Sequence, residues 1–321
     1  MDLIYANEKA EDIGVLPDYT FDLAFGKDEN DFELTLDRNN HCCKAGYFIY
    51  IEGTEYGGVV DSIQVNTDKE KVIYMGRTWH GILSKKILCP DDSQDYLTVT
   101  GEANVVIASL IERIGLSDMF EVSTEDSQVN INYQFARYID AYTGIRKMLV
   151  ASGCKLIFKY EKGRVELSAL PFIDYSMDEQ FDSDQIALDI QKNYNKVNHL
   201  ICLGSGELKD RQVIHLYADK EGNISKTQTF TGIDEQTEIY DYANAESLEE
   251  LEQGGIERLT ECLSEGAVDV DFDAEETVYD IDDVVGSIEN VTGIEVTASI
   301  TKKIVTINQG TIKIKYEVGE L

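Results

Sequence analysis

The sequence has little positive charge and few proline, tryptophan and histidine residues for its 321 residues. Its 28 lysines and arginines stand against 61 aspartates and glutamates, which gives a net charge of −33. DNA and anionic lipid surfaces carry the same sign, so specific nucleic-acid binding and membrane anchoring are disfavoured. Three prolines and 24 glycines exclude collagen-like and proline-rich chains. No apolar run approaches the ~18 residues that a membrane-spanning helix needs.

The six cysteines show no CxxC spacing, and Cys42 and Cys43 are adjacent. Cys154 and Cys202 lie beside or within apolar runs. We therefore expect thiols that behave as small hydrophobic side chains in a protein made in a reducing cytoplasm. The N-terminus has neither a basic nor an apolar leader region, so no signal peptide is predicted.

Apolar residues make up 43% of the chain, which is enough to bury a core, and the length suggests about two domains. Residues 1–98 contain short alternating stretches, such as 32–36, and a hairpin pattern over 56–65 and 72–79. Sequential hairpins without helices between them favour a small barrel or sandwich.

Helical periodicity appears next, at residues 103–114 and 137–151, followed by a hairpin at 155–160 and 164–170. This middle part is typical of a small α/β unit. A further helix is expected to begin at Asn244 or Ser247, with a kink or break at Gly254-Gly255. Further strands are predicted at residues 197–203, 212–217, 224–231, 277–281, 294–300, 303–307 and 311–318. The fold class is therefore α+β, with two β-barrel-like bodies, an inserted α/β domain and a connecting helix.

Motifs for catalysis or metal binding are weak. The four histidines, at 41, 80, 199 and 215, lie on separate segments without HxxxH or HExxH spacing, so core or surface roles explain them best. His199 and His215 could lie on neighbouring strands. The loop Gly204-Ser205-Gly206 lacks the third glycine and the helix of a dinucleotide site, which favours a hairpin turn.

The acidic run at residues 269–276 has carboxylates at positions 1, 3 and 5 of a calcium loop, but it lacks the glycine and glutamate that complete one. An edge strand with a solvated face is the better interpretation. Trp79 could form a sugar-stacking platform with Tyr74 and Tyr47, although a core role for Trp79 is favoured. No catalytic, cofactor-binding or metal-ligating residue is assigned.

Several segments, taken in order, resemble one family. They are residues 56–63, 76–83, 95–99, 197–208, 279–286 and 312–318, beginning with Tyr56-Gly57-Gly58-Val59-Val60-Asp61-Ser62-Ile63. Their order and spacing over nearly the whole chain resemble the phage tail baseplate hub proteins of Gram-positive prophages and phage-derived injection particles.

This resemblance implies a virion protein of the tail baseplate, made in the bacterial host cytoplasm, that forms a homotrimer. Two tube-like barrels per chain would adapt the sixfold tail tube or distal tail ring to a threefold spike or tip protein, with the tape-measure protein as a further partner. The expected domains are an N-terminal barrel (1–98) completed by returning strands (185–235), an inserted α/β domain (99–184), and a helix with a second barrel (236–321).

The family implies no enzyme activity for this polypeptide, because the wall-degrading and receptor-binding domains of many relatives lie in C-terminal extensions. A tail-tip cell-wall hydrolase and a carbohydrate-binding tail module remain the alternatives. Because like charges give no affinity for DNA, part of the negative charge is expected to line the channel of the ring.

Overall fold

The computed structural model describes residues 2–176, 180–182, 196–245, 247–264, 270–273, 278–289, 291, 294–308 and 310–319. This part of the chain is mostly β-strand with four α-helices, which confirms the predicted α+β class. The chain forms two compact units: unit 1 is Met1–Leu188 with Asp271–Val318, and unit 2 is Asp189–Val270 with Gly319–Leu321. None of the helices among the described residues is both long enough and apolar enough to cross a bilayer.

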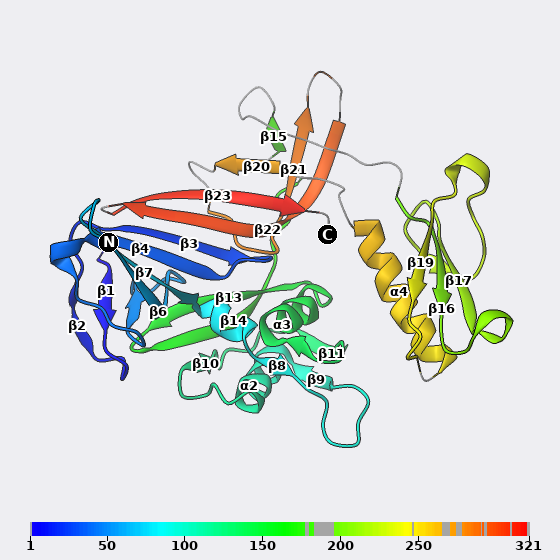
Figure 1. Ribbon diagram of the computed structural model, residues 1–321, viewed down its shortest axis with the longest axis horizontal. Coiled ribbons are helices and arrows are strands. Elements are labelled where there is room, and N and C mark those ends of the chain that lie inside the picture. The colour runs from blue at the N-terminus through cyan, green and yellow to red at the C-terminus, as the bar shows by residue number, and fades with distance from the viewer. Residues whose placement is uncertain are drawn as a thin grey trace. The chain divides into compact units, whose positions relative to one another are not determined.

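A large sheet dominates unit 1 (Figure 1). Its strands are β1 (Ile4–Ala6), β2 (Asp12–Val15), β3 (Thr20–Gly26), β4 (Asp31–Asp37), β5 (Phe48–Tyr50), β6 (Gly57–Asn66), β7 (Lys71–Thr78), β15 (Gln180–Asp182), β20 (Val270–Asp273), β21 (Val284–Glu289), β22 (Ile294–Asn308) and β23 (Thr311–Gly319). The hydrogen-bonded order is β15-β21-β22-β3-β4-β7-β6-β5-β1-β2, with β23 pairing to β22 and β20. Burial alternates along β4, where Phe32, Leu34 and Leu36 face the core, as the sequence alternation predicts.

The long strand β22 changes partner along its length. Its first half pairs with β21, ending with Val284 opposite Ser299, and its second half pairs with β3, beginning with Lys302 opposite Gly26. Between these two ladders, Ile300 exchanges backbone hydrogen bonds with residues 282 and 283 at 2.9 and 2.8 Å. The turn that precedes β21 is therefore attached where the strand changes partner.

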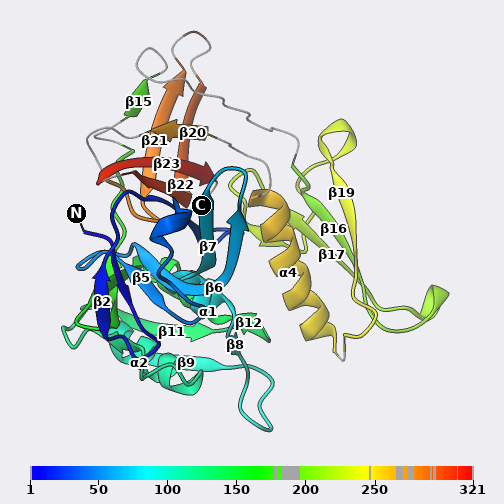
Figure 2. The ribbon, with the colours of Figure 1, turned by 60° about the vertical axis from the view of Figure 1, so that its left-hand side comes forward.

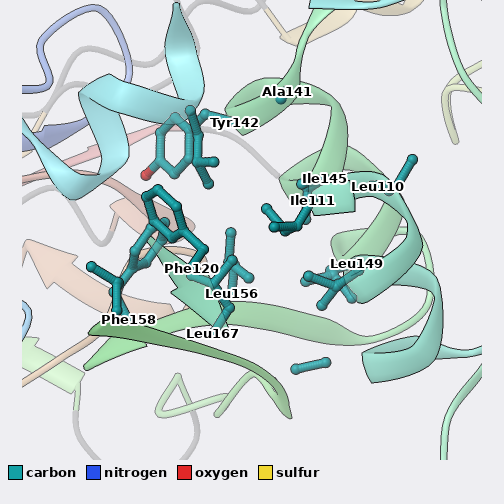
Figure 3. Close-up of a cluster of buried hydrophobic side chains, with 14 of the residues drawn as sticks. Leu110, Ile111, Phe120, Ala141, Tyr142, Ile145, Leu149, Leu156, Phe158 and Leu167 are labelled. Carbon is teal, nitrogen blue, oxygen red and sulfur yellow. The ribbon is translucent and has the colours of Figure 1, made fainter. Parts of the chain in front are cut away.

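The predicted α/β unit follows β7. Its elements are α1 (Trp79–Ser84), β8 (Ile87–Leu88), β9 (Thr98–Glu102), α2 (Ala103–Arg113), β10 (Phe120–Val122), β11 (Asn130–Gln134), β12 (Ile139–Asp140), α3 (Ala141–Val150), β13 (Cys154–Glu161) and β14 (Arg164–Pro171). The second predicted helix begins at Ala141 instead of residue 137, because the Asp140 side chain accepts a hydrogen bond from the Thr143 amide (2.9 Å) and caps the N-terminus of α3. Figure 3 shows Ile111 of α2 and Ile145 of α3 beside Leu156 of β13 in one buried cluster.

Unit 2 is a four-stranded sheet with one helix. Its elements are β16 (His199–Leu203), β17 (Val213–Ala218), β18 (Ile224–Ser225), β19 (Thr237–Asp241), α4 (Leu248–Ser264) and two 3-10 turns, η2 (Leu208–Asp210) and η3 (Gly232–Asp234). The strand order is β18-β17-β16-β19, and α4 lies along one face (Figure 2). Leu200, Leu216 and Leu251 meet in its core.

The helix does not break at Gly254-Gly255, because α4 continues through both residues. A Cβ on Gly255 would lie 2.5 Å from the sulfur of Cys202, and a Cβ on Gly254 would lie 3.0 Å from the Tyr240 hydroxyl. The two glycines therefore let the helix approach the sheet closely, and their packing role outweighs their low helix propensity.

The strand pairing also differs from the expected assembly. Strands within residues 185–235 were expected to complete the N-terminal body, but β16, β17 and β18 pair with one another and with β19. The N-terminal strands instead continue into β22, whose Val305 and Ile307 are buried in the same core as Phe21 and Leu23. Alternation alone cannot distinguish these partners, because each candidate strand has one apolar face. Closure of either body into a barrel stays a prediction.

Candidate functional site

The turn at residues 278–283 carries three aspartates that bind cations of other elements. Its backbone is not a strand, contrary to the prediction for residues 277–281, and Asp282 has a left-handed conformation with φ of +75°. The Tyr279 amide donates a hydrogen bond to the Tyr316 hydroxyl (3.0 Å). These features hold the turn against β23 and direct acidic side chains toward the α/β unit.

Lys155 of β13 is almost completely buried, with 3% of the residue exposed. Its Nζ donates to Asp280 Oδ2 at 2.7 Å and to both oxygens of Asp283 at 2.8 and 2.9 Å. Burial by itself lowers the pKa of Lys155, but the bonds to the two aspartates outweigh burial and raise it. Lys155 is therefore a permanent cation.

Arg146 of α3 makes a second link to the same turn. Its Nε and Nη2 donate to the two carboxylate oxygens of Asp282 at 3.1 and 2.5 Å, which is a bidentate pair. The guanidinium also lies 5.3 Å from the ring centre of Tyr142. Burial raises the pKa of the Tyr142 hydroxyl, so this group stays protonated.

Lys303 of β22 completes the group from the large sheet. Its Nζ lies 2.6 Å from Glu55 Oε1 and 3.9 Å from Asp280 Oδ1. Glu55 also lies 3.6 Å from Nε2 of His80, which is fully buried against the ring of Phe158. Burial, followed by the charges of Lys303 and Arg146, lowers the pKa of His80 well below 6.5, so its imidazole is neutral.

We call this group the ionic junction: Glu55, Arg146, Lys155, Asp280, Asp282, Asp283 and Lys303. Most of its members, with His80 and Tyr142, line a cavity of about 470 Å³. All four carboxylates accept hydrogen bonds from a cation. An acid catalyst needs a carboxyl group that keeps a proton, which an apolar or like-charged setting provides. The junction has the opposite setting, so it suits attachment of the α/β unit to the sheet rather than proton transfer.

A second hollow, also of about 470 Å³, lies on the outer face of the large sheet. We call it the acidic groove, and its ionisable lining is Asp22, Asp31, Glu33, Asp61 and Arg77. Asp61 sits at a bulge in β6 and binds the Arg77 guanidinium through both oxygens at 2.8 Å. Partial burial, and then the charge of Glu29, raises the pKa of Asp31. The ionisable lining of the groove is predominantly acidic, with four carboxyl groups and one guanidinium.

The structure decides the role of Trp79. The indole is fully buried and stacks on Tyr160, with ring centres 5.0 Å apart. Tyr74 is 1% exposed. The core role predicted for Trp79 is confirmed, and the side chain is not available as a sugar-stacking surface.

The predicted histidine and glycine positions are distributed over both units. His199 and His215 lie side by side on β16 and β17, with Nε2 and Nδ1 2.8 Å apart, and Glu235 lies 2.7 Å from the other nitrogen of His199. Within the described part of the chain, no group of three or more His, Cys, Asp or Glu side chains is arranged to hold a metal ion. Gly206, with φ of +105°, turns the chain between β16 and β17, which confirms the hairpin.

The acidic run at residues 269–276 is described only in part. Its residues 270–273 form β20, which pairs with β23. The remaining positions of the run lie outside the described residues, so the calcium interpretation is not tested.

No protein-family model matches the sequence, and no curated protein matches it. Several solved structures do match. A tail protein from Neisseria meningitidis aligns with a TM-score of 0.56 and 11% identity, over 99% of this chain and 96% of that one. A prophage tail protein from Listeria monocytogenes aligns with a TM-score of 0.54 and 13% identity, over 100% and 95% of the two chains. A prophage tail protein from Shewanella oneidensis aligns with a TM-score of 0.58 and 9% identity, over 100% of this chain and 98% of that one.

The chain has the fold of prophage tail proteins. The alignments span nearly all of each matched structure. The tail-protein fold therefore includes unit 2 and all of unit 1 with its α/β elements. The resemblance inferred from the sequence is confirmed at the level of the fold. The ionic junction is thus a connection inside a tail-protein fold, between elements far apart in the sequence.

The first prediction concerns Lys155. Replacing it with methionine leaves Asp283 buried without its cation, which we expect to lower the free energy of unfolding by about 3–5 kcal/mol. Lys159→Met on the same strand removes an exposed pair with Glu161, which water already screens, and should cost much less stability than Lys155→Met. Urea denaturation followed by circular dichroism measures both values, and equal losses in the two variants would contradict a buried link.

The second prediction concerns His80. In the unfolded chain its pKa is ordinary, near 6.5, so below that pH the unfolded state binds a proton that the folded state does not. The stability contributed by neutral His80 is therefore complete above pH 6.5 and is lost as the pH falls toward the lower folded pKa. The slope should reach about 1.4 kcal/mol per pH unit.

His80→Gln should reduce this slope, whereas the exposed-site variant His41→Gln should keep it. The measurement is the denaturation midpoint between pH 7 and pH 5. An unchanged slope in His80→Gln would show that another group titrates.

The third prediction uses Trp79, which is the only tryptophan in the chain. Its fluorescence should show the short-wavelength emission of a buried indole and stay constant when soluble peptidoglycan fragments are added. Denaturant should shift the emission to longer wavelength, which provides the positive control. Quenching or a shift caused by the glycan alone would revive the carbohydrate-binding alternative.

Proposed function

We propose that the chain is a structural subunit of a phage tail baseplate, namely a homotrimeric hub that joins the tail tube or distal tail ring to the spike or tip protein. The observation that carries this proposal is the end-to-end match to tail proteins, with TM-scores of 0.54–0.58 over 95–98% of their length. An alignment confined to one unit could reflect a domain that unrelated proteins share. An alignment over the whole chain favours a role as a tail component for this protein too.

The charge distribution supports this assignment. A hub encloses a passage, and an acidic lining gives DNA no counterion-release affinity through which to stick. The acidic groove has the composition that such a wall needs, with four carboxylates around one arginine. The groove is therefore our candidate for part of the lining.

The ionic junction supports a structural role as well. An assembly part must hold the relative positions of its docking surfaces. Arg146 of α3 and Lys155 of β13 bind the turn at residues 278–283, and Lys303 of β22 binds Glu55 and lies 3.9 Å from Asp280 of that turn. The hydrolase alternative has less support, because the carboxylates of this cavity are occupied by ion pairs. The carbohydrate-binding alternative has less support because Trp79 is buried.

Co-expression tests the proposal. The chain should be produced together with a tail-tube or distal tail protein from the same genome, because a hub can require its neighbour before it trimerises. Light scattering of the purified complex should give a total mass that, after the mass of the bound partner is subtracted, corresponds to three copies of this chain. A complex containing one or two copies, or the absence of any complex with tail components, would contradict the hub.

Activity on host peptidoglycan provides an independent check. The purified chain should release no muropeptides in an assay in which lysozyme serves as the positive control. Release that persists after Glu55→Gln would indicate a catalytic centre elsewhere, and release abolished by it would identify the junction cavity as catalytic. Either result would favour the hydrolase.

A further inference from the structure

The adjacent thiols of Cys42 and Cys43 are the feature of unit 1 that the structural role leaves unused. They lie in the loop between the 3-10 turn η1 (Arg38–Asn40) and β5, with their sulfurs 3.6 Å apart. Both backbone amides donate to the Tyr74 hydroxyl, at 3.1 and 3.3 Å. This double hydrogen bond fixes the dipeptide from a fully buried side chain of β7.

The two thiols have different environments. Cys42 is partly exposed, whereas Cys43 is 6% exposed and belongs to the hydrophobic core of the sheet. The hydrogen bond from the Cys43 thiol lowers the pKa of Cys42, and the same bond, followed by burial, raises the pKa of Cys43. A partly exposed thiol with a lowered pKa and a second sulfur in contact is the arrangement of an attacking and a resolving cysteine.

We propose that Cys42 and Cys43 form a redox-active dithiol that low-molecular-weight disulfides, such as oxidised glutathione, convert into a reversible disulfide between the adjacent residues. The Cys42 thiolate attacks one glutathione sulfur, the glutathione S–S bond breaks, and one glutathione leaves and takes up a proton. Cys43 then loses its proton and attacks Cys42 Sγ, which releases the second glutathione. Two protein thiols are oxidised, and one disulfide is reduced to two thiols.

The covalent geometry makes this bond easy to reduce. Adjacent α-carbons across a trans peptide are about 3.8 Å apart, below the 4.4–6.8 Å of ordinary disulfides. The resulting ring is strained, and strained disulfides are the labile ones. Capping of Cys42 removes the thiol whose hydrogen bond, and to a smaller extent whose charge, raises the pKa of Cys43, and this favours the second step. The dithiol would thus respond to a change from reducing to oxidising surroundings, whatever assembly the chain joins.

Mass spectrometry of the native full chain tests the proposal directly. Trypsin cleaves after Arg38 and Lys44, so one peptide, residues 39–44, contains both thiols and no other cysteine. After treatment with oxidised glutathione and alkylation with iodoacetamide, this peptide should lack two hydrogen atoms and carry no adduct. Dithiothreitol should restore two alkylatable thiols. Two alkylated cysteines after oxidation, or a stable glutathione on Cys42, would overturn the proposal.

Matched control variants distinguish the attacking role of Cys42 from the resolving role of Cys43. Cys43→Ser should retain one glutathione on Cys42, and Cys42→Ser should prevent the rapid reaction at this peptide. The lone exposed thiol of Cys89 reports glutathione addition without resolution in the same sample. If a serine variant fails to fold, the wild-type peptide still decides the outcome, because the mass of its disulfide form differs from that of every adduct.

Discussion

One buried ammonium group, that of Lys155 between Asp280 and Asp283, is the interaction on which the architecture of unit 1 depends. Removing an ion from water costs several kcal/mol, and the cost is offset only when its partners are placed within hydrogen-bond distance. The ion pairs of the three cations in the junction therefore restrict the relative positions of α3, β13, β22 and the turn at residues 278–283. Hydrophobic contacts alone would permit small displacements that leave their buried area unchanged.

The tail-protein fold appears here at 9–13% identity to solved relatives, so few particular side chains are shared among these chains. What the chains have in common is the arrangement of elements, which alternation and amphipathic periodicity can specify with many different residues. In this chain the sheet core is such an apolar cluster, which other hydrophobic residues of similar size could form; it includes Phe21, Leu23, Val305 and Ile307. We infer that the ion pairs of the junction add conformational specificity to this core.

The sequence predicted those parts that depend on local pattern. The alternation of Phe32, Leu34 and Leu36 located β4, and the apolar stripe through Val106, Leu110 and Ile111 located α2. The partner of β22 was not predictable, because pairing is chosen by long-range packing. The same limit hid the ionic junction, in which Lys155 and Asp280 are 125 residues apart. A signal was present nonetheless. Lys155 directly precedes the apolar run Leu156-Ile157-Phe158, three aspartates lie within residues 280–283, and such charged groups need a partner once they are buried.

The change of partner along β22 has a mechanical consequence. Seven residue pairs join its second half to β3, and their hydrogen bonds lie across the strand direction. A force pulling along β22 loads all seven pairs at once, so they resist together instead of opening one by one. Ile300, at the change of partner, is anchored to residues 282 and 283, so tension that reaches this point divides between the sheet and the turn. In a particle that transmits force along its axis, β22 would resist the pulling force. Strands would separate first in shorter ladders, such as the three-residue pairing of β5 with β6.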